Sequence, residues 1–399
     1  MKIAIMANAN EHDFKSRETK YLCEIIDKPM IAYPIQQAQC LSEEVYVVAR
    51  EHEKLKAAVE KSGAVFVEES AAKSFFAQFA DEPVLVIQGD ELHIPTNMLS
   101  TLIRLHNSSD TPVTYVKTDD YILAHYHGLG EQLPPYITAA NSFAPLADVL
   151  KAYPNAEAYA VPNYISERIV SRQDLSTIIY RISSENCEKH MHNGVSILDS
   201  LSFSAVLIGS DVIIEADAVI HPNVQITGKT HIGAGTVIRS GTRIHNMTIG
   251  ADCEIEQSVL LESSVGNATK VGPFAYIRPG SDIGSHCRIG NFVEVKNSNI
   301  GDNSKAAHLS YIGDSDIGKN VNYACGCITA NYDGTNKHRT TIEDDVFVGS
   351  NSTLIAPVRL GKNCFIAAGS TINQDVEPLA LAIARERQVN KPNRVTPKK

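Results

Sequence analysis

Residues 226–244 read ITGKTHIGAGTVIRSGTRI, a stretch in which isoleucine recurs every six residues. Isoleucine keeps this register over residues 208–244, and Val, Ile or Leu resumes it over 271–295 and 342–372. A small residue often stands four positions after the aliphatic one, as Thr230 and Thr236 do. A period of six fits neither an amphipathic helix nor a simple alternating strand. It is the signature of a hexapeptide parallel β-helix.

Each hexad of such a β-helix supplies one short strand and one turn, and three hexads close one triangular coil. The aliphatic residue points into the prism, and the small residue fits where the interior is narrow. One coil cannot bury its own apolar face, so stability comes from stacking many coils. We expect the left-handed coil that is typical of this class, an exception to the right-handed crossover rule.

The chain has 399 residues, a net charge of −10 and 43% apolar residues, enough for two domains of ordinary composition. The acidic balance argues against a nucleic-acid partner, and no apolar run is long enough for insertion into a membrane. The N-terminus, MKIAIMANANEHDF, has too short an apolar core for a secretory signal. We therefore expect a cytoplasmic protein.

The cysteines follow the hexad register. Four of the eight stand at the small-residue position: Cys253, Cys287, Cys327 and Cys364. Their placement indicates reduced thiols packed in a core, so we expect no disulfides. Cys325 and Cys327 are too close together, and too isolated from other ligands, to predict a zinc site.

The first part of the chain, residues 1–165, alternates apolar strands with helical stretches, which predicts an α/β domain with a mainly parallel sheet. Expected strands are Lys2–Ala7, Val45–Ala49, Val84–Ile87 and Val113–Val116, and expected helices are Met30–Leu41, Glu51–Lys61 and Met98–His106. In such sheets ligands bind at the carboxyl ends of strands. The loop Asn8–Asp13 has no glycine with which to admit a phosphate, whereas Asp90 is either a magnesium ligand or a solvated turn residue.

Three further segments interrupt this organisation. Residues 166–185 predict a bridging helix with an apolar stripe that includes Ile178 and Ile182. Residues 329–341, TANYDGTNKHRTT, form a polar insert, which is where function tends to lie on a solenoid. The basic tail, residues 385–399, is either solvated or a contact for a polyanion such as coenzyme A.

Several motifs within the hexad region occur in a family-specific order. They are GPFAYIRPG (272–280), NFVEVK (291–296), KAAHLSYIGD (305–314), ITANYDGTNKHRT (328–340), DDVFVGS (344–350) and IAAGSTI (366–372). In these motifs the chain closely resembles the acetyltransferase half of the bifunctional N-acetylglucosamine-1-phosphate uridyltransferase / glucosamine-1-phosphate acetyltransferase family. The resemblance covers roughly the last two-fifths of the chain. It implies a homotrimer that transfers acetyl from acetyl-CoA to glucosamine-1-phosphate, on the route to UDP-N-acetylglucosamine and cell-wall polymers such as peptidoglycan.

The family's residue roles carry over by position. His308 matches the catalytic base, which would take the proton of the substrate ammonium. The positions that match its substrate-binding residues are Arg278, Lys296, Tyr311, Asn322 and Lys337. The positions that match its acetyl-CoA contacts are Asn331, Tyr332, Ser350, Ala368, Arg385 and Cys325, the last of which replaces an alanine of the family. No metal is expected for acetyl transfer.

The N-terminal half departs from the family. The uridyltransferase loop G-x-G-T-R is represented by Ala9–Asp13, and Lys20 is its one alignable basic residue. Asp90 matches the metal-binding aspartate, but its usual asparagine partner is replaced near Ser166, and the intervening segment is shorter. We expect a degenerate nucleotidyltransferase-like domain over 1–165, a linker helix over 166–200, a left-handed β-helix acetyltransferase domain over 201–384 and a basic tail over 385–399. Mg²⁺ would be needed only if uridyltransferase activity survives.

Other interpretations stay open. The enzyme could be fully bifunctional, or the β-helix could be a non-catalytic scaffold or regulatory trimer. A zinc-binding β-helix is disfavoured because no two prism histidines show the required five-residue spacing. Taken alone, His308 would be an ordinary surface histidine, but its A-x-H-x-x-Y setting favours catalysis. Arg278 and Lys296 could be solvated charges.

Overall fold

The computed structural model describes residues 1–8, 14, 18–92, 94–117, 135–161, 168–169, 171–198 and 206–392. The chain divides into two compact units, Met1–Ile179 and Tyr180–Lys399. Of the expected site positions, the loop residues Ala9–Asp13 and Ser166 lie outside the described residues.

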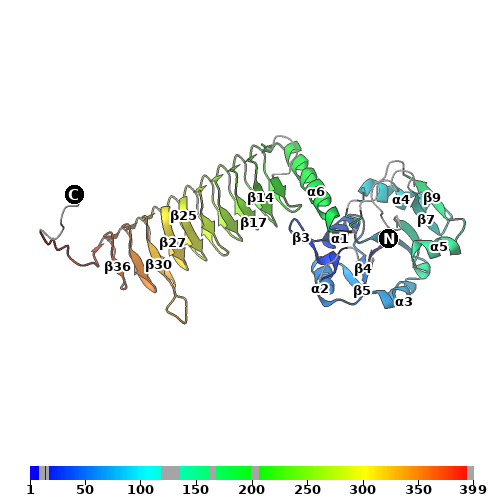
Figure 1. Cartoon of the computed structure of the whole chain (residues 1–399), viewed down its shortest axis with the longest axis horizontal. Helices are drawn as coiled ribbons and strands as arrows, with labels where there is room; N and C mark the ends of the chain where they lie inside the picture. Colours follow the sequence, from blue (N-terminus) through cyan, green and yellow to red (C-terminus); the bar gives the residue numbers. More distant parts are fainter. Residues whose placement is uncertain are drawn as a thin grey trace, which may run out of the picture. The chain divides into compact units, whose positions relative to one another are not determined.

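Unit 1 is built on one sheet with the strand order β5-β4-β1-β6-β8-β7-β9. Its strands are β1 (Lys2–Ala7), β4 (Val45–Ala49), β5 (Val65–Glu68), β6 (Pro83–Gln88), β7 (Val113–Lys117), β8 (Tyr136–Ala139) and β9 (Glu157–Ala160), beside a small β2 (Glu24–Ile25) and β3 (Lys28–Pro29) hairpin. Its helices are α1 (Ala32–Gln39), α2 (Glu53–Lys61), α3 (Ala72–Ala77), α4 (Thr96–Ser108) and α5 (Leu146–Ala152) (Figure 1).

The four strands expected from the sequence are all present, two of them with the expected bounds. β1 pairs in parallel with β4 and β6, and within the described strands of this seven-stranded sheet only β8 runs antiparallel to its neighbours. The prediction of a mainly parallel α/β sheet is therefore confirmed. The prediction is correct because apolar residues fill most positions of β1, β4 and β6, and nearly all of these positions are buried, as a sheet covered on both faces requires.

Helix α6 (Arg172–His192) begins later than the expected residue 166, and it ends between residue 185 of the expected helix and residue 200 of the expected linker. Its first turn is closed by Asp174, whose Oδ2 accepts hydrogen bonds from the Ser171 backbone N–H at 2.7 Å and from Ser171 Oγ at 3.0 Å. Ile178 and Ile182 of the expected stripe are buried. The division between the two units falls within this helix.

Unit 2 is a parallel β-helix with three faces. Face 1 consists of β10 (Ser196–Ile197), β13 (Val219–Ile220), β16 (Val237–Ile238), β19 (Glu254–Ile255), β22 (Lys270–Val271), the first residues of β25 (Arg288–Lys296) and β27 (Lys305–Gly313), β29 (Asn322–Tyr323), β32 (Phe347–Val348), β35 (Phe365–Ile366) and β37 (Leu381–Ala382). Face 2 consists of β11 (Val206–Ile208), β14 (Val224–Thr227), β17 (Arg243–His245), β20 (Val259–Leu261), β23 (Tyr276–Ile277), the last residues of β25 and β27, β30 (Ile328–Ala330), β33 (Thr353–Ile355) and β36 (Thr371–Ile372).

Face 3 is a separate sheet. It consists of β12 (Ile213–Ile214), β15 (His231–Ile232), β18 (Thr248–Ile249), β21 (Ser264–Val265), β24 (Asp282–Ile283), β26 (Asn299–Ile300), β28 (Ser315–Ile317), β31 (Thr340–Ile342) and β34 (Val358–Leu360). Every strand pairs in parallel with its equivalents on adjacent coils, in the repeating layers that Figure 1 shows from β14 to β36. The hexapeptide β-helix predicted from the sequence is confirmed, and it is of the left-handed class.

The stack begins earlier than the expected residue 201. Ser196 and Ile197 form β10, which pairs with β13, so the residues that directly follow α6 already belong to the first coil. Their alternation is too short to be distinguished from a helix end by sequence alone.

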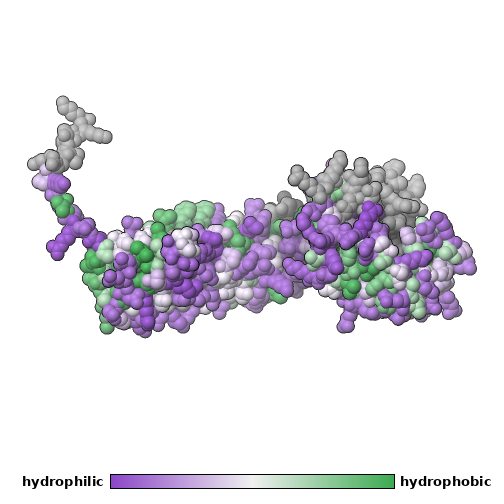
Figure 2. Space-filling view, turned by 90° about the horizontal axis from the view of Figure 1, so that it is seen from below, coloured by the Kyte–Doolittle hydropathy of each residue, from purple (hydrophilic) through white to green (hydrophobic). Residues whose placement is uncertain are grey.

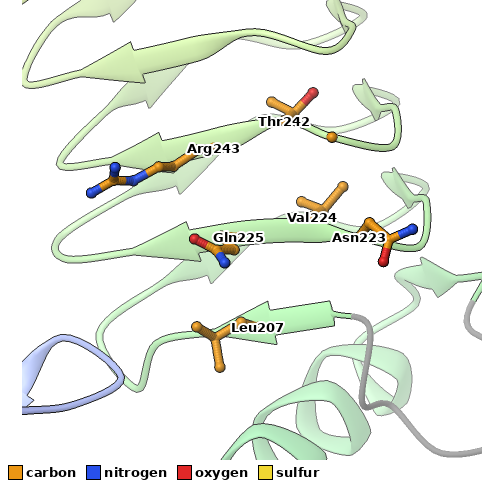
Figure 3. A pocket seen from close by; sticks show the side chains of 7 residues that line it. Leu207, Asn223, Val224, Gln225, Thr242 and Arg243 are labelled. Carbon is orange, nitrogen blue, oxygen red and sulfur yellow. The ribbon is translucent and has the colours of Figure 1, made fainter.

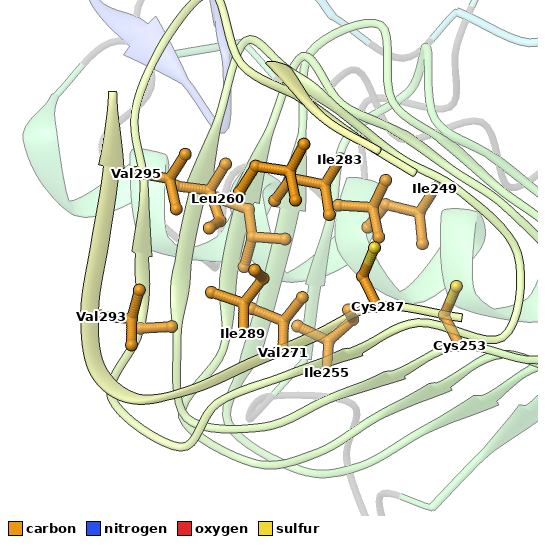
Figure 4. Packing of buried hydrophobic residues seen from close by; sticks show 14 of the residues in the cluster. Ile249, Cys253, Ile255, Leu260, Val271, Ile283, Cys287, Ile289, Val293 and Val295 are labelled. Carbon is orange, nitrogen blue, oxygen red and sulfur yellow. The ribbon is translucent and has the colours of Figure 1, made fainter. Parts of the chain in front are cut away.

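The interior of unit 2 is a set of aliphatic ladders. Ile255, Val271 and Ile289 follow one another in register on face 1, while Ile249, Val265 and Ile283 do so on face 3. Figure 4 shows Ile249, Ile255, Val271, Ile283 and Ile289 pointing into the prism, with the thiols of Cys253 and Cys287 among them. Burial of each Val or Ile side chain contributes about 1.5–3 kcal/mol to the stability of the fold. The stack is therefore stabilised by many contributions of similar size. The four expected core thiols are buried and free, as predicted.

The surface of unit 2 has two further features. The insert after β30 leaves the stack as a projecting loop (Figure 1). Large apolar side chains are exposed toward the C-terminal end of the stack, where green surface shows in Figure 2, and include Phe347, Phe365 and Leu381. Among the described residues, no helix is long and apolar enough to cross a membrane.

Candidate active site

One corner of the prism, between faces 1 and 2, carries a column of side chains that we call the corner column: Asn291, His308, Cys325, Ser350 and Ala368. Asn291 and His308 are direct register partners of β25 and β27. The pairings Lys305↔Asn322, Tyr323↔Val348 and Val348↔Ile366 continue the column through the next three coils. The structure therefore places the expected base in one line with three expected acetyl-CoA contacts.

The members of the corner column that follow His308 are small and exposed. Cys325, Ser350 and Ala368 are all exposed, and none carries a bulky side chain. The side chain of Arg385 lies beside Gly369, with its Cδ at 3.9 Å from the position that a Cβ would occupy there. The corner thus offers a narrow exposed strip that ends at a cation.

His308 is exposed, and its Nδ1 lies 2.8 Å from Oδ1 of Asn291 on the preceding coil. The backbone carbonyl of His308 also accepts a hydrogen bond from Ser310 Oγ at 2.8 Å. The residue is therefore held by the coil on which it stands and by the coil before it.

Face 2 runs from the corner column to a group of three cations that we call the cation cluster: Arg278, Lys296 and Lys337. Arg278 follows β23, and Lys296 ends β25 one coil further on, in the same register. Arg278 Nη1 donates to Glu294 Oε1 at 2.7 Å, and Lys296 Nζ donates to Asp314 Oδ2 at 3.2 Å. The cluster has three cations and two carboxylates, so one positive charge is left for an anion.

Lys337 reaches the cluster from the insert. The hydrogen bond and charge of Lys296 lower the pKa of Lys337, because two ammonium groups meet there. A bound phosphate would relieve that repulsion, which is a physical reason to expect an anion at this place. Tyr311, an expected substrate contact, lies on face 2 in register with Glu294, the residue that pairs with Arg278.

Asp314, to which the sequence assigned no role, organises this end of the face. Its buried carboxylate accepts hydrogen bonds from Lys296, from Asn297 Nδ2 at 2.6 Å and from Asn331 Nδ2. Burial would raise the pKa of Asp314, but the hydrogen bonds from Asn297, Lys296 and Asn331 outweigh it and hold the pKa below its usual range. Asp314 thus joins an expected phosphate contact to an expected acetyl-CoA contact. It stands at the end of the motif KAAHLSYIGD, which was the available signal.

The insert is an ordered turn. Asp333 Oδ1 accepts from the backbone N–H groups of Asn336 at 2.6 Å and Thr335 at 2.7 Å, and its Oδ2 contacts His338 Nε2 at 2.7 Å. The backbone bond from Asn336 is the largest of the causes that lower the pKa of Asp333 to about 2. The side chain of Tyr332 is exposed, and its backbone forms an isolated antiparallel β-bridge with that of Lys337. A turn held by these hydrogen bonds can present the side chains of Tyr332 and Lys337 at fixed positions.

The remaining expected residues lie elsewhere in the single chain. Asn322 stands on face 1, between Lys305 and Phe347 in the register. Asn331 and Tyr332 lie at the corner between faces 2 and 3, whereas Ser350 and Ala368 lie in the corner column. One chain therefore brings together the cation cluster, Tyr311 and Asn331, but it leaves the expected acetyl-CoA contacts on two corners.

In unit 1 the expected metal ligand Asp90 is engaged by two cations. Its Oδ2 accepts from Lys20 Nζ at 2.7 Å and from Arg168 Nη2 at 2.8 Å, and its Oδ1 accepts from Arg168 Nε at 3.0 Å. Asp90 is completely buried and Lys20 almost so. Burial would raise the pKa of Asp90, yet the hydrogen bonds and charges of Arg168 and Lys20 hold it below its usual range. A carboxylate enclosed in this way does not fit a Mg²⁺ ion, which needs open oxygen ligands.

A hollow of about 480 Å³ lies on early coils of face 2, lined by Leu207, Asn223, Val224, Gln225, Gly241, Thr242 and Arg243. Figure 3 shows Leu207, Gln225 and Arg243 one above another on successive strands. None of the expected site residues lines it. Among the described residues there is also no group of three His, Cys, Asp or Glu side chains that could hold a metal.

The fold and the corner column define a class of protein, the hexapeptide-repeat transferases. Residues 211–246 and 262–297 match the family model of the bacterial transferase hexapeptide (six repeats), and residues 339–374 match the hexapeptide repeat of succinyl-transferase. Over 452 aligned residues the chain is 34% identical to the bifunctional protein GlmU of Geobacillus sp. (strain WCH70), which covers 98% of this chain and 96% of that protein. The chain belongs to the GlmU family.

Two further relatives have the same name. The bifunctional protein GlmU of Staphylococcus epidermidis is 34% identical over 97% of each chain. The bifunctional protein GlmU of Brevibacillus brevis is 54% identical over 202 residues, which is 51% of this chain and 43% of that relative. The similarity is thus higher over part of the chain than over its whole length.

Proposed function

We propose that the chain transfers the acetyl group of acetyl-CoA to the amine of glucosamine-1-phosphate, in the synthesis of UDP-N-acetylglucosamine. The observation that carries this proposal is the corner column, in which His308 is followed by Cys325, Ser350 and Ala368. Membership of the GlmU family supports the same reaction. So does the cation cluster on the adjoining face.

The reaction needs a free amine, because an ammonium ion has no lone pair with which to attack a thioester. His308 takes one proton from the ammonium. The amine nitrogen then attacks the carbonyl carbon, the C–S bond breaks, and coenzyme A leaves as a thiolate that takes up a proton. The nitrogen loses its remaining extra proton and the amide is formed. No covalent acyl-enzyme is required.

The acceptor is held through its phosphate. Arg278 and Lys296 present an Arg fork and a Lys point charge to one end of face 2, and Lys337 adds a third donor. Tyr311 and Glu294 lie between this end and the corner column. Asn291 of the corner column and Lys296 of the cation cluster are five residues apart on β25, at most roughly 17 Å of extended strand, a length that a phosphorylated sugar and the side chains that hold it can span.

The coenzyme contacts argue for a site shared between copies. Ser350, Ala368 and Arg385 lie at one corner, whereas Asn331 and Tyr332 lie at another, and Asn322 stands on face 1. A homotrimer would bring one corner of a protomer against another face of its neighbour. The exposed Phe347, Phe365 and Leu381 offer apolar surface for such a contact.

We further propose that unit 1 makes no UDP-sugar. The buried contacts of Asp90 with Lys20 and Arg168 take the carboxylate that a magnesium ion would use. The competing function is the full bifunctional reaction, which the alignment with GlmU proteins over nearly the whole chain favours.

Two assays on the purified protein test these proposals. The first supplies acetyl-CoA and glucosamine-1-phosphate and measures the thiol released, with glucosamine-6-phosphate and glucosamine as comparison acceptors. Absence of release with glucosamine-1-phosphate would overturn the acetyl-transfer proposal. The second supplies UTP, Mg²⁺ and N-acetylglucosamine-1-phosphate and measures pyrophosphate. Release at a rate comparable with acetyl transfer would overturn the proposal for unit 1.

A further inference from the structure

Asn291 has no assigned role, yet its Oδ1 lies 2.8 Å from Nδ1 of His308. An amide oxygen can only accept a hydrogen bond. In neutral His308 the hydrogen must therefore stay on Nδ1, which leaves the lone pair on Nε2. We infer that Asn291 is a positioning residue that holds His308 in the tautomer with a basic Nε2. This inference rests on the proposed function of His308 as the base.

The backbone brings this pair together. Gly290, which precedes Asn291, lies so close to the next coil that a Cβ there would stand 1.9 Å from the carbonyl oxygen of Ala307. Any larger residue would force the coils apart at the height where Asn291 meets His308. The close approach of β25 to β27 is thus provided by a glycine beside the pair.

The corner beyond Asn291 is fixed as well. Phe292 adopts a left-handed backbone with φ of 59°, which is unusual for a bulky residue. Its ring stacks on Phe274 of the preceding coil, with ring centres 5.5 Å apart and planes 11° from parallel. Phe274 has the same left-handed backbone, with φ of 59°. Two stacked rings therefore hold the turn from which Asn291 extends.

The choice of an amide has a chemical consequence. A carboxylate at residue 291 would also orient the ring, but its charge would stabilise the imidazolium form and raise the pKa of His308. An amide orients the ring without adding charge. The titratable side chains closest in the register are Cys325, one coil further on, Tyr311 and Glu294 around the corner on face 2, and Lys305 and Arg288 on face 1. None of them takes the place of the Asn291 contact with Nδ1.

The first test reads the tautomer directly. ¹⁵N spectra of the full-length protein labelled at histidine, compared with those of His308→Ala, assign the two ring nitrogens of His308. We expect a protonated Nδ1 and an unprotonated Nε2 above the pKa of the ring, and a mixture of tautomers in Asn291→Ala. A proton on Nε2 in the unaltered protein would overturn the inference, because the amide nitrogen would then be the group facing the ring. This measurement does not depend on any acetyl transfer.

The second test uses the pH profile of acetyl transfer. Asn291→Ala should lower kcat by roughly 10- to 100-fold through misorientation of the base, with little change in the KM of either substrate. Asn291→Asp should restore most of that loss at high pH and move the acidic limb of kcat/KM upward by roughly 1–3 pH units. If Asn291→Asp leaves the limb in place, Asn291 has only a structural role.

Thr227 provides a matched control. Its Oγ1 lies 2.9 Å from Nδ1 of His245 on the next coil, an equivalent contact far from the site along the stack. Thr227→Ala should leave both kcat and the pH profile unchanged. If Thr227→Ala lowers kcat as much as Asn291→Ala does, loss of any inter-coil contact suffices and the inference is wrong. If the unaltered protein shows no acetyl transfer, the proposed function fails, while the tautomer measurement still decides the role of Asn291.

Discussion

Lys20 and Asp90 form a buried ion pair in unit 1, with Lys20 Nζ 2.7 Å from Asp90 Oδ2. The two residues are 70 positions apart, and Arg168 completes the arrangement from a third segment. Asp90, the residue expected to match the family's metal-binding aspartate, joins three separate segments of the unit through these contacts. Removing one partner of such a group leaves the others charged and buried, which is far more costly than losing a surface pair.

Asp90→Asn should therefore destabilise unit 1 by about 3–5 kcal/mol. Urea unfolding followed by a probe in unit 1 measures this change. Asp148→Asn, which removes an exposed pair with Lys151, is the control and should cost about 1 kcal/mol or less. A cost for Asp90→Asn no larger than that of the control would contradict the cross-linking role.

The same carboxylate predicts a pH dependence. The pKa of Asp90 is lowered in the folded state, so its stabilisation is complete above the unfolded pKa, about 3.9, and is lost as the pH falls through the lower folded value. The unaltered protein should therefore lose stability below about pH 4 more steeply than Asp90→Asn does. Identical pH profiles of the unfolding free energy in the two proteins would contradict this prediction.

His308→Ala should lower acetyl transfer by roughly 10²–10⁴-fold, the usual effect of losing a general base, without changing the assembly state. Free thiol release measures the rate, and light scattering measures the assembly. His231→Ala, on face 3 and paired with Glu215, is the control and should retain the full rate. Turnover of His308→Ala close to that of the control would assign the proton transfer to another group.

Lys296→Gln and Arg278→Gln should each raise the KM for glucosamine-1-phosphate, by roughly 10- to 100-fold, since charge-assisted contacts contribute about 1.5–3 kcal/mol. The KM for acetyl-CoA should change much less in Arg278→Gln. Lys270→Gln, which removes an exposed cation paired with Glu254, is the control. An acceptor KM that is unchanged in both variants would place the phosphate pocket elsewhere.

A fragment consisting of Tyr180–Lys399 should keep acetyl transfer within about threefold, because each coil is stabilised by contacts with its neighbours in the stack. Its far-UV circular dichroism should show β-structure that melts cooperatively. A folded fragment without activity would mean that unit 1 contributes to the acetyl-transfer site.

Local spacing made much of the fold predictable. The hexad register identified the interior residues of unit 2 because an inward side chain must recur once for each strand, and β1 and β4 were delimited by continuous apolar runs. The start at β10 was missed because two residues carry no period.

The site was predictable only in part. The motifs named His308 and Lys296 through resemblance, but the contacts of Asn291 and Asp314 depend on which residues meet across coils. That register is altered by turns and inserts of variable length. The pairing of Asp90 with Lys20 and Arg168 was missed for the same reason, since it joins segments that no local pattern connects.

The register of unit 2 also fixes the distances between site residues along the prism. Members of the corner column are separated by whole coils, and each coil adds one strand spacing of about 4.8 Å. Three steps from His308 to Ala368 therefore set a reach of roughly 14 Å along the prism. Removing or adding one complete coil between them would change this reach by one strand spacing. The aliphatic residues of the remaining coils would still stack in register. In such a molecule the number of coils between two site residues sets the length of ligand that can be accommodated. That length can change in evolution without a change in the packing that stabilises each coil.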